Sequence, residues 1–271
     1  MSSDFDAENL LQRAKGGDQA ALEELLRTVQ PQLYRFSMKM CRHTEDAEDV
    51  LQDSLMSLAR SFKDFRGASS FSTWLFAVAR SFCIKKRRKS KFAPPHEESL
   101  DQLTEEQRDQ IPSKEPSPHD TAESHELWRQ VKDAIAKIQP DYREILVLRD
   151  IEGLSAKEVA AIVELSVPAV KSRLHRARSM LRDELAASPY RPPSGCPDIR
   201  RVFSEHLEGD LSPSICASME SHVENCPACA TECSGLRDVL NACSTAPCEV
   251  PPEVQRRVQR ALKEALEVQK T

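Results

Sequence analysis

Apolar residues recur at intervals of three and four positions along most of this chain of 271 residues, the spacing of one face of an amphipathic helix. The pattern predicts two helices between residues 7 and 42, a third over 46–62 and a fourth that starts near Ser70 or Ser72 and reaches residue 91. Either serine can cap the start of that helix through its hydroxyl. The chain contains 7 glycines, few for its length, which disfavours a turn-rich β fold. The predicted fold class is all-α.

The pattern resumes after residue 123 and predicts a helix-turn-helix. Ser155-x-x-Glu158 has the form of a capping box that opens a short helix, and Ser166 can cap the helix that follows. The second helix turns Val170 and Leu174 inward, and such a helix is suited to enter the major groove of DNA. Its outer face is predicted to present polar and basic side chains that could meet phosphates and base edges, namely Lys171, Ser172, Arg173, His175, Arg176, Arg178 and Arg182.

The last part of the chain predicts a small helical module after a proline-rich break. Helices are expected over 198–208, 213–225 and 228–243, and an amphipathic helix follows Pro251 and Pro252. We therefore expect two helical domains, over residues 1–92 and 124–188, joined by an acidic linker with several prolines over residues 93–123. A C-terminal helical metal-binding domain is expected over residues 189–271.

Charge is segregated along the chain, although the net charge is only −5. The polar face of the helix over 46–62 is acidic, whereas residues 85–91 are almost all basic. That basic run exceeds what a helix C-terminus needs and suits nucleic-acid phosphates. The sequence contains neither a signal peptide nor an apolar run near the ~18 residues of a membrane span, so a cytoplasmic protein is expected.

The cysteines point to a metal centre in the C-terminal module. Seven of the 9 cysteines lie beyond residue 195, and the remaining two, Cys41 and Cys83, are interpreted as buried thiols. His222-x3-Cys226-x2-Cys229 joins a one-turn helical step to a chelating knuckle. A Cys3His set is typical of tetrahedral zinc, and its fourth ligand is predicted to be Cys196, with Cys216 and Cys233 as rivals.

More thiols are present than one zinc ion requires. Cys216, Cys233, Cys243 and Cys248 remain after the predicted quartet. Cys243 and Cys248 stand where the helical pattern breaks, so we predict that they are mobile and close onto a second ion together with Cys216 or Cys233. Thiolates select soft metals, and the expected ion is zinc or another soft transition metal such as copper or cadmium.

Two stretches resemble the extracytoplasmic-function (ECF) group of bacterial sigma factors. These are FRGASSFSTWL with the following ARSFCI and basic run, and LSVPAVKSRLHRARSML. The resemblance covers roughly residues 8–188. It implies a sigma region 2 that binds RNA polymerase core and melts the −10 promoter element, and a sigma region 4 whose recognition helix reads the −35 element.

The resemblance also implies roles for particular residues. The residues expected to bind the β′ clamp helices of RNA polymerase are Asp46, Glu48, Asp49, Gln52 and Asp53. Region 4 is expected to bind the β flap. The loop over 64–71 would capture a flipped base, with Arg66, Ser69 and Ser70 as hydrogen-bond donors. The DNA backbone would be held by Arg80, Lys85, Lys86, Arg87 and Arg88.

The tail resembles the zinc-binding anti-sigma fold, which is a separate protein for ordinary ECF factors. Its fusion behind region 4 resembles the metal-responsive ECF sigma factors of the CorE type, which carry a C-terminal cysteine-rich domain. That resemblance implies a sigma factor regulated in cis by metal binding. Its expected partners are RNA polymerase core and promoter DNA, with no membrane and no small-molecule substrate.

Other classes fit the sequence less well. A metal- or redox-responsive helix-turn-helix regulator that acts without polymerase would have no use for the acidic helix or for the basic stretch. A zinc hydrolase needs an open coordination position and a general base, but the predicted metal set is closed and rich in thiolates. No catalytic constellation is recognisable, and we expect that the chain is not an enzyme.

Overall fold

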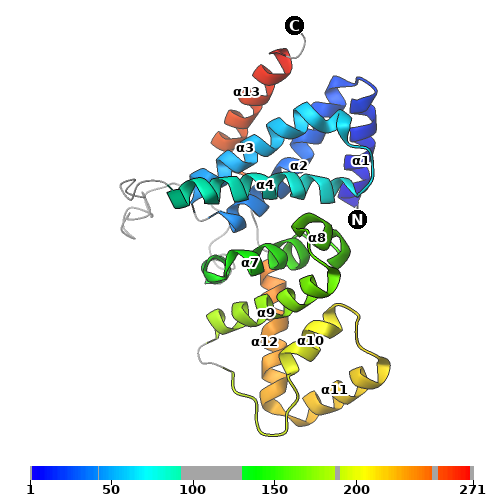
Figure 1. The fold of residues 1–271 in the computed structure, drawn as a ribbon, viewed down its shortest axis with the longest axis vertical. Helices are drawn as coiled ribbons and strands as arrows, with labels where there is room; N and C mark the ends of the chain where they lie inside the picture. Colours follow the sequence, from blue (N-terminus) through cyan, green and yellow to red (C-terminus); the bar gives the residue numbers. More distant parts are fainter. Residues whose placement is uncertain (1, 42, 93–129, 187–189, 246–249, 269–271) are drawn as a thin grey trace, which may run out of the picture. The chain divides into compact units, whose positions relative to one another are not determined.

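The computed structural model describes residues 2–41, 43–92, 130–186, 190–245 and 250–268 (Figure 1). The regular elements within these ranges are helices, and no strand occurs among them, so the all-α prediction is confirmed. None of the described helices is long and apolar enough to cross a membrane. The chain forms two compact units, made of residues 1–127 with 248–271, and of residues 128–247.

The first unit is a bundle of long helices. It contains α1 (Ser2–Lys15), α2 (Gln19–Met40), α3 (Thr44–Ser61), the 3-10 helix η1 (Phe62–Asp64), α4 (Phe71–Phe92) and α13 (Pro252–Val268). Its core is made of fully buried side chains such as Leu25, Leu55 and Leu75, with the rings of Phe36 and Phe76 at 5.3 Å. The predicted inward face of α3 is buried, because its apolar residues follow the helical period.

The loop between η1 and α4 is held at both ends. The backbone N–H of Thr73 donates to Ser70 Oγ at 3.2 Å, so the predicted serine cap is Ser70. The rings of Phe65, Phe71 and Trp74 form a cluster with centroid distances of 5.5–6.0 Å. Lys15 of α1 also donates to the carbonyl oxygen of Phe65, which fixes the start of the loop.

The last helix belongs to the first unit, not to the cysteine-rich module. Val254 and Val258 of α13 are buried, and α13 packs along α3 (Figure 1). Arg257 forms an ion pair with Glu48 of α3 at 2.6 Å. The prediction of one module over residues 189–271 is therefore wrong at its C-terminal end, because the apolar stripe of α13 is buried against α3.

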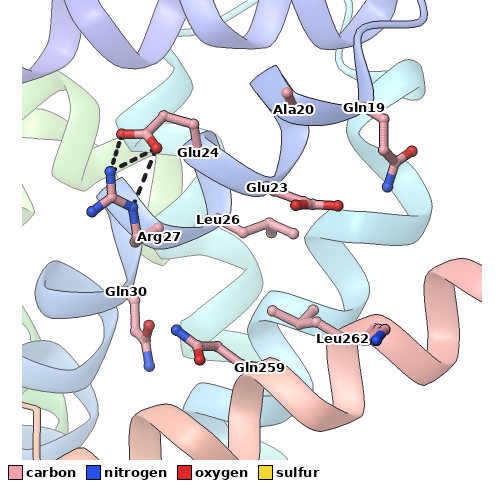
Figure 2. Close-up of a pocket in the computed structure, with 10 residues that line it drawn as sticks. Gln19, Ala20, Glu23, Glu24, Leu26, Arg27, Gln30, Gln259 and Leu262 are labelled. Carbon is pink, nitrogen blue, oxygen red and sulfur yellow. Dashed lines mark hydrogen bonds and ion pairs between the residues drawn. The ribbon is translucent and has the colours of Figure 1, made fainter.

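A groove of about 660 Å³ runs between α2 and α13 (Figure 2). Leu262 and Gln259 line it from α13, and Gln30 lines it from α2. Glu24 and Arg27 on its wall pair with each other at 2.6 Å. Since this side is only loosely filled, the packing of α13 on the bundle rests chiefly on α3.

The second unit joins the helix-turn-helix to the cysteine-rich helices. Residues 130–137 are helical, and they precede α7 (Pro140–Leu146), the π-helical turn η3 (Val147–Ile151), α8 (Ala156–Val163), α9 (Val167–Leu185), α10 (Ile199–Leu207), α11 (Pro213–Asn225) and α12 (Pro227–Thr245). The capping box of Ser155 and Glu158 is formed, and Ser166 caps α9 by accepting from the N–H of Ala169. The predicted caps of the helix-turn-helix are therefore confirmed.

Two helices of the cysteine-rich segment, α10 and α12, pack on the recognition helix α9. Both α10 and α12 contact α9, and α12 also contacts η3. Their shared core contains Ile199, Phe203, Cys229, Cys233 and Leu236. The unit therefore places the predicted metal ligands in the same packed body as the predicted DNA-reading helix.

Candidate metal centre and DNA-binding helix

Four predicted ligands come together from three segments. Cys196 lies in the segment before α10, His222 is in the last turn of α11, Cys226 is the C-cap of α11, and Cys229 lies in the first turn of α12. One candidate ligand atom from each lies within 4.8 Å of every other. The helix-to-helix turn at Pro227 brings the two halves of the knuckle together.

The spacing of these atoms fits a zinc ion. Cys196 Sγ and Cys226 Sγ are 3.8 Å apart, and His222 Nε2 lies 3.3 Å from Cys229 Sγ. A tetrahedral ion with Zn–S bonds of about 2.3 Å separates two sulfur ligands by about 3.8 Å. The set offers three sulfur donors and one nitrogen donor, which is the chemistry of a closed structural zinc site.

The local electrostatics favour a cation at this point. The backbone N–H of Cys229 lowers the pKa of the Cys226 thiol. Burial, together with the thiols of Cys229 and Cys226, raises the pKa of Cys196 to about 11. Several thiolates cannot share this small volume without a cation, because like charges oppose one another. A bound metal ion would replace the protons of the ligand thiols.

The remaining cysteines do not form a second cluster among the described residues. Cys243 is buried in α12 rather than mobile, so that prediction is wrong. Cys233 is buried in the core, and this burial raises the pKa of its thiol to about 11. Cys216 lies 3.8 Å from Nδ1 of His206. Cys248 lies outside the described residues. The role of these four thiols as ligands of a second ion stays a prediction.

The two early cysteines differ from each other. Cys83 of α4 is buried as predicted, whereas Cys41, at the C-terminal cap of α2, is only half-buried. Both belong to the first unit, whereas the four clustered ligands belong to the second.

The predicted base-reading face of α9 is only partly open. Ser172 and Arg176 are exposed, and Lys171, Arg173 and His175 are half-buried. Lys171 forms an ion pair with Asp210, which follows α10. Burial lowers the pKa of His175, so its imidazole favours the neutral form.

Arg178 does not lie on the outer face of α9, and that part of the prediction is wrong. Its guanidinium is buried and pairs with Asp150 at 2.6 Å and with Glu208 at 3.0 Å. It also donates to Ser204 Oγ at 2.8 Å. Burial works against the charge, but the hydrogen bonds to the two carboxylates outweigh it and raise the pKa of Arg178. This side chain joins α9 to α10.

A second ionic contact joins α9 to α12. Arg200 of α10 pairs with Asp183 of α9 at 2.8 Å and with Glu232 of α12 at 2.7 Å. Glu232 is buried and also lies 3.5 Å from Arg182 of α9. Arg182 was predicted to face outward, but its side chain is largely covered. Tyr190, Arg200, Glu208, Asp210 and Glu232 were not predicted from the sequence, because their roles depend on how the helices pack.

The predicted residues of the first unit lie on two helices and one loop. On α3, Asp49 and Asp53 are exposed, Asp46, Glu48 and Gln52 are half-buried, and Lys86 of α4 pairs with both Asp46 and Asp49. Arg66 and Ser69 are exposed in the loop, and the hydroxyl of Ser70 is engaged at the start of α4. Among the side chains of α4 whose burial is described, Lys85, Arg87 and Arg88 are exposed cations, and Arg80 is half-buried.

Three family models match the chain along its length. The Sigma-70 region 2 model matches residues 25–92, the Sigma-70, region 4 model matches residues 128–181, and a zinc-finger model matches residues 196–230. Fold and site therefore define a sigma-type transcription initiation factor with an attached zinc-finger segment that holds the Cys and His cluster.

Relatives with curated descriptions agree with this class. The chain is 31% identical over 174 residues to the ECF RNA polymerase sigma factor SigE of Mycolicibacterium smegmatis, and it spans 65% of that protein and 63% of its own length. It is 29% identical to SigW of Bacillus subtilis over 65% of this chain and 94% of SigW. It is 30% identical to the ECF sigma-E factor of Salmonella typhimurium over 68% of this chain and 97% of that protein.

The chain belongs to the ECF sigma factor family. Sigma factors are transcription initiation factors and not enzymes, as predicted. A helix-turn-helix regulator that acts without polymerase would not need region 2, so that alternative has no support.

Removal of one knuckle ligand should abolish metal binding. Cys226→Ser should lose stoichiometric zinc and lower the thermal stability of the second unit, because a structural site contributes directly to folding. Cys216→Ser, which alters a thiol outside the cluster, is the matched control and should keep its zinc. Metal content and circular dichroism of the purified full chain measure both effects. Full zinc content in Cys226→Ser would contradict the assignment of the ligands.

Proposed function

We propose that this ECF sigma factor directs RNA polymerase core to specific promoters and that its cysteine-rich segment regulates it in cis through a bound metal. One observation carries the proposal. The helix α12, which carries the candidate ligand Cys229, packs on α9, the helix that would read DNA, together with α10. Carboxylates of the same C-terminal segment, those of Glu208, Asp210 and Glu232, pair with cations of α9.

Region 2 would provide the contact with polymerase and the −10 element. The acidic side chains of α3 would meet the basic β′ clamp helices, which is supported by the exposure of Asp49 and Asp53. The loop before α4 would capture an unpaired base, since its ends are fixed while Arg66 and Ser69 stay exposed. The exposed cations of α4 would follow the DNA backbone, as a basic track does in single-strand binding.

Region 4 would read the −35 element with the open part of α9 and meet the β flap. Arg173 and Arg176 are candidates for bidentate pairing with guanine, whereas Lys171 suits a phosphate. While α10 is docked, Arg178 does not contact DNA, because Asp150 and Glu208 hold its buried guanidinium.

The contact between α10 and the helix-turn-helix would compete with DNA. Glu208 and Asp210 present carboxylates to Arg149, Arg178 and Lys171, as phosphates would. A metal that stabilises the cysteine-rich helices would stabilise this docked state, because a ligand favours the state that it binds best. The metal-bound chain would therefore be the less active form.

The helix α13 would compete with RNA polymerase core for the acidic surface of α3. It covers part of α3 and pairs Arg257 with Glu48, one of the acidic residues predicted to meet the clamp helices. The groove that α13 leaves toward α2 indicates a contact of limited extent, which a large partner surface could displace.

Transcription with purified core polymerase tests the whole proposal. On a promoter library with randomised −35 and −10 elements, the chelator-stripped chain should produce more transcript than the zinc-loaded chain, and re-addition of zinc should reverse the effect. Cadmium and Cu(I) are further candidates because soft ions favour thiolates. No transcript with any metal state would contradict the function. Equal transcript in all metal states, with a change on peroxide, would instead indicate redox sensing.

Neutralisation of the carboxylate at Asp210 should strengthen DNA binding. Asp210→Asn should raise the affinity of the zinc-loaded chain for a DNA duplex by up to about 5-fold, since exposed ion pairs contribute about 0.2–1 kcal/mol. The slope of log affinity against log salt concentration should also become steeper by about 1, because Lys171 becomes available for a phosphate. Asp238→Asn, an exposed carboxamide variant on α12, is the control of equal charge. The same affinity in both variants would exclude competition by Asp210.

Release of α13 should strengthen binding to core polymerase. Val258 is 1% exposed, so Val258→Asp places a charge in the buried contact with α3 and should raise the affinity for core by about tenfold, or about 1.4 kcal/mol. Arg256→Gln changes the net charge by the same amount at an exposed position of α13 and should have little effect. Fluorescence anisotropy with labelled chain and purified core measures both. Unchanged affinity in Val258→Asp would show that α13 does not compete for this surface.

A further inference from the structure

Tyr190 links the metal centre to a network of charged side chains on the recognition helix. Its hydroxyl lies 3.3 Å from Cys229 Sγ, and the guanidinium of Arg200 lies 5.3 Å from the centre of its ring. We infer that Tyr190 and Arg200 are positioning residues that transmit the occupancy of the metal centre to α9. This inference rests on the proposed metal regulation and names the residues that carry it.

The tyrosine hydroxyl is placed to act on a ligand. A phenol donates a hydrogen bond, and the Cys229 sulfur accepts it in either the thiolate or the metal-bound form. Hydrogen bonds from outside the ligand set orient ligands and tune the affinity of a metal site. Cys196, a second ligand, follows Tyr190 in the same short segment, so closing the site also fixes the tyrosine ring.

Arg200 connects that ring to α9. The guanidinium rests over the aromatic ring, which attracts a cation, and it pairs with Asp183 of α9 at 2.8 Å. It also donates to the backbone carbonyl oxygen of Ser179 in α9 at 3.5 Å. Its side chain is only 12% exposed, so a shift of the ring alters contacts that water does not replace easily.

The helix α12 provides a parallel connection. Glu232 lies one turn after Cys229 and accepts from Arg200 at 2.7 Å, and it also pairs with Arg182 of α9 at 3.5 Å. At Gly235 an added Cβ would come within 2.6–2.9 Å of the guanidinium atoms of Arg182. The absence of a side chain at Gly235 therefore leaves the space that the guanidinium of Arg182 occupies.

These contacts predict the direction of the coupling. A bound ion holds Cys196 and Cys229 together, which orders the ring of Tyr190 and the guanidinium of Arg200 against α9. The same docking keeps Asp210 on Lys171 and so lowers the affinity for DNA. Metal binding then lowers the affinity for DNA by the same factor by which DNA binding lowers the affinity for the metal, as linkage requires.

The test measures DNA affinity of the full chain with saturating zinc and after chelation. A short mixed-sequence duplex at low salt is the probe, and the stripped-to-loaded ratio of affinities should be at least about fivefold for the wild type. Arg200→Gln and Gly235→Ala should each lower this ratio, because each breaks one of the two connections to α9, and the variant that combines them should bring it close to one while zinc affinity stays unchanged. Arg201→Gln, an exposed neighbour with the same loss of charge, should keep the wild-type ratio.

Tyr190→Phe gives an independent readout. The ring and its contact with Arg200 remain, but the donor to Cys229 is lost, so zinc affinity should fall by about 10- to 100-fold. With Co²⁺ in the site, the sulfur-to-metal absorption band should shift in Tyr190→Phe and stay in place in Arg200→Gln. A purely packing role for Tyr190 would leave both the zinc affinity and the band unchanged, and this result would overturn the inference.

The outcomes separate the two proposals. A wild-type ratio near one would overturn the proposed metal regulation, and the coupling path with it. A wild-type ratio of fivefold that persists in Arg200→Gln and Gly235→Ala would overturn the coupling path alone and leave metal regulation in place.

Discussion

The second unit depends on the burial of one positive charge, that of Arg178. A buried guanidinium is tolerated only when hydrogen-bonding anions surround it, and here one carboxylate comes from the helix-turn-helix and the other from α10. Arg149 shares the second carboxylate, Glu208, at 3.1 Å. The two cations and two anions balance while α10 is docked. If α10 left, Arg149 and Arg178 would face water beside the single carboxylate of Asp150, and phosphates could then replace Glu208.

The contacts made by the cysteine-rich helices and by α13 share a physical character that suits competition. Each combines a small apolar surface with ion pairs, such as Arg257 with Glu48 or Lys171 with Asp210. Because both partners belong to one chain, their effective concentration is of the order of millimolar, and modest contacts are sufficient to hold them. Large interfaces with polymerase and DNA can still displace them. In the proposed mechanism these intramolecular contacts therefore inhibit the sigma factor reversibly.

The sequence was informative wherever structure depends on neighbours along the chain. Ser155, Glu158 and Ser166 are caps because capping needs only a few adjacent residues, and the apolar face of α3 follows from its period. The ligand quartet was also predictable, since three of its members lie within eight residues and only Cys196 had to come from elsewhere. In each case the relevant distances are fixed by helix geometry.

Prediction failed where the outcome depends on which surfaces meet. Asp150 covers only part of the Arg178 guanidinium, and Ser204 and Glu208 of the distant α10 segment complete its burial. Cys243 looked mobile because it stands near the end of a pattern, but α12 continues past it. The pairing of Arg257 with Glu48 spans 209 positions, and no local rule relates them.

The helix α12 explains how one small metal site can matter to a DNA-reading surface. Cys229, Glu232 and Gly235 follow one another at intervals of three residues, so a single rigid helix carries a metal ligand, a buried carboxylate and the space for Arg182. A helix transmits a displacement at one end to the next turn because its backbone hydrogen bonds resist local bending. A metal ion that fixes the first turn of α12 therefore also fixes the position of Glu232 relative to Arg182 and Arg200. The regulatory path proposed here begins with the ordering of the first turn of α12, and Glu232 in the next turn carries it to Arg182 of α9.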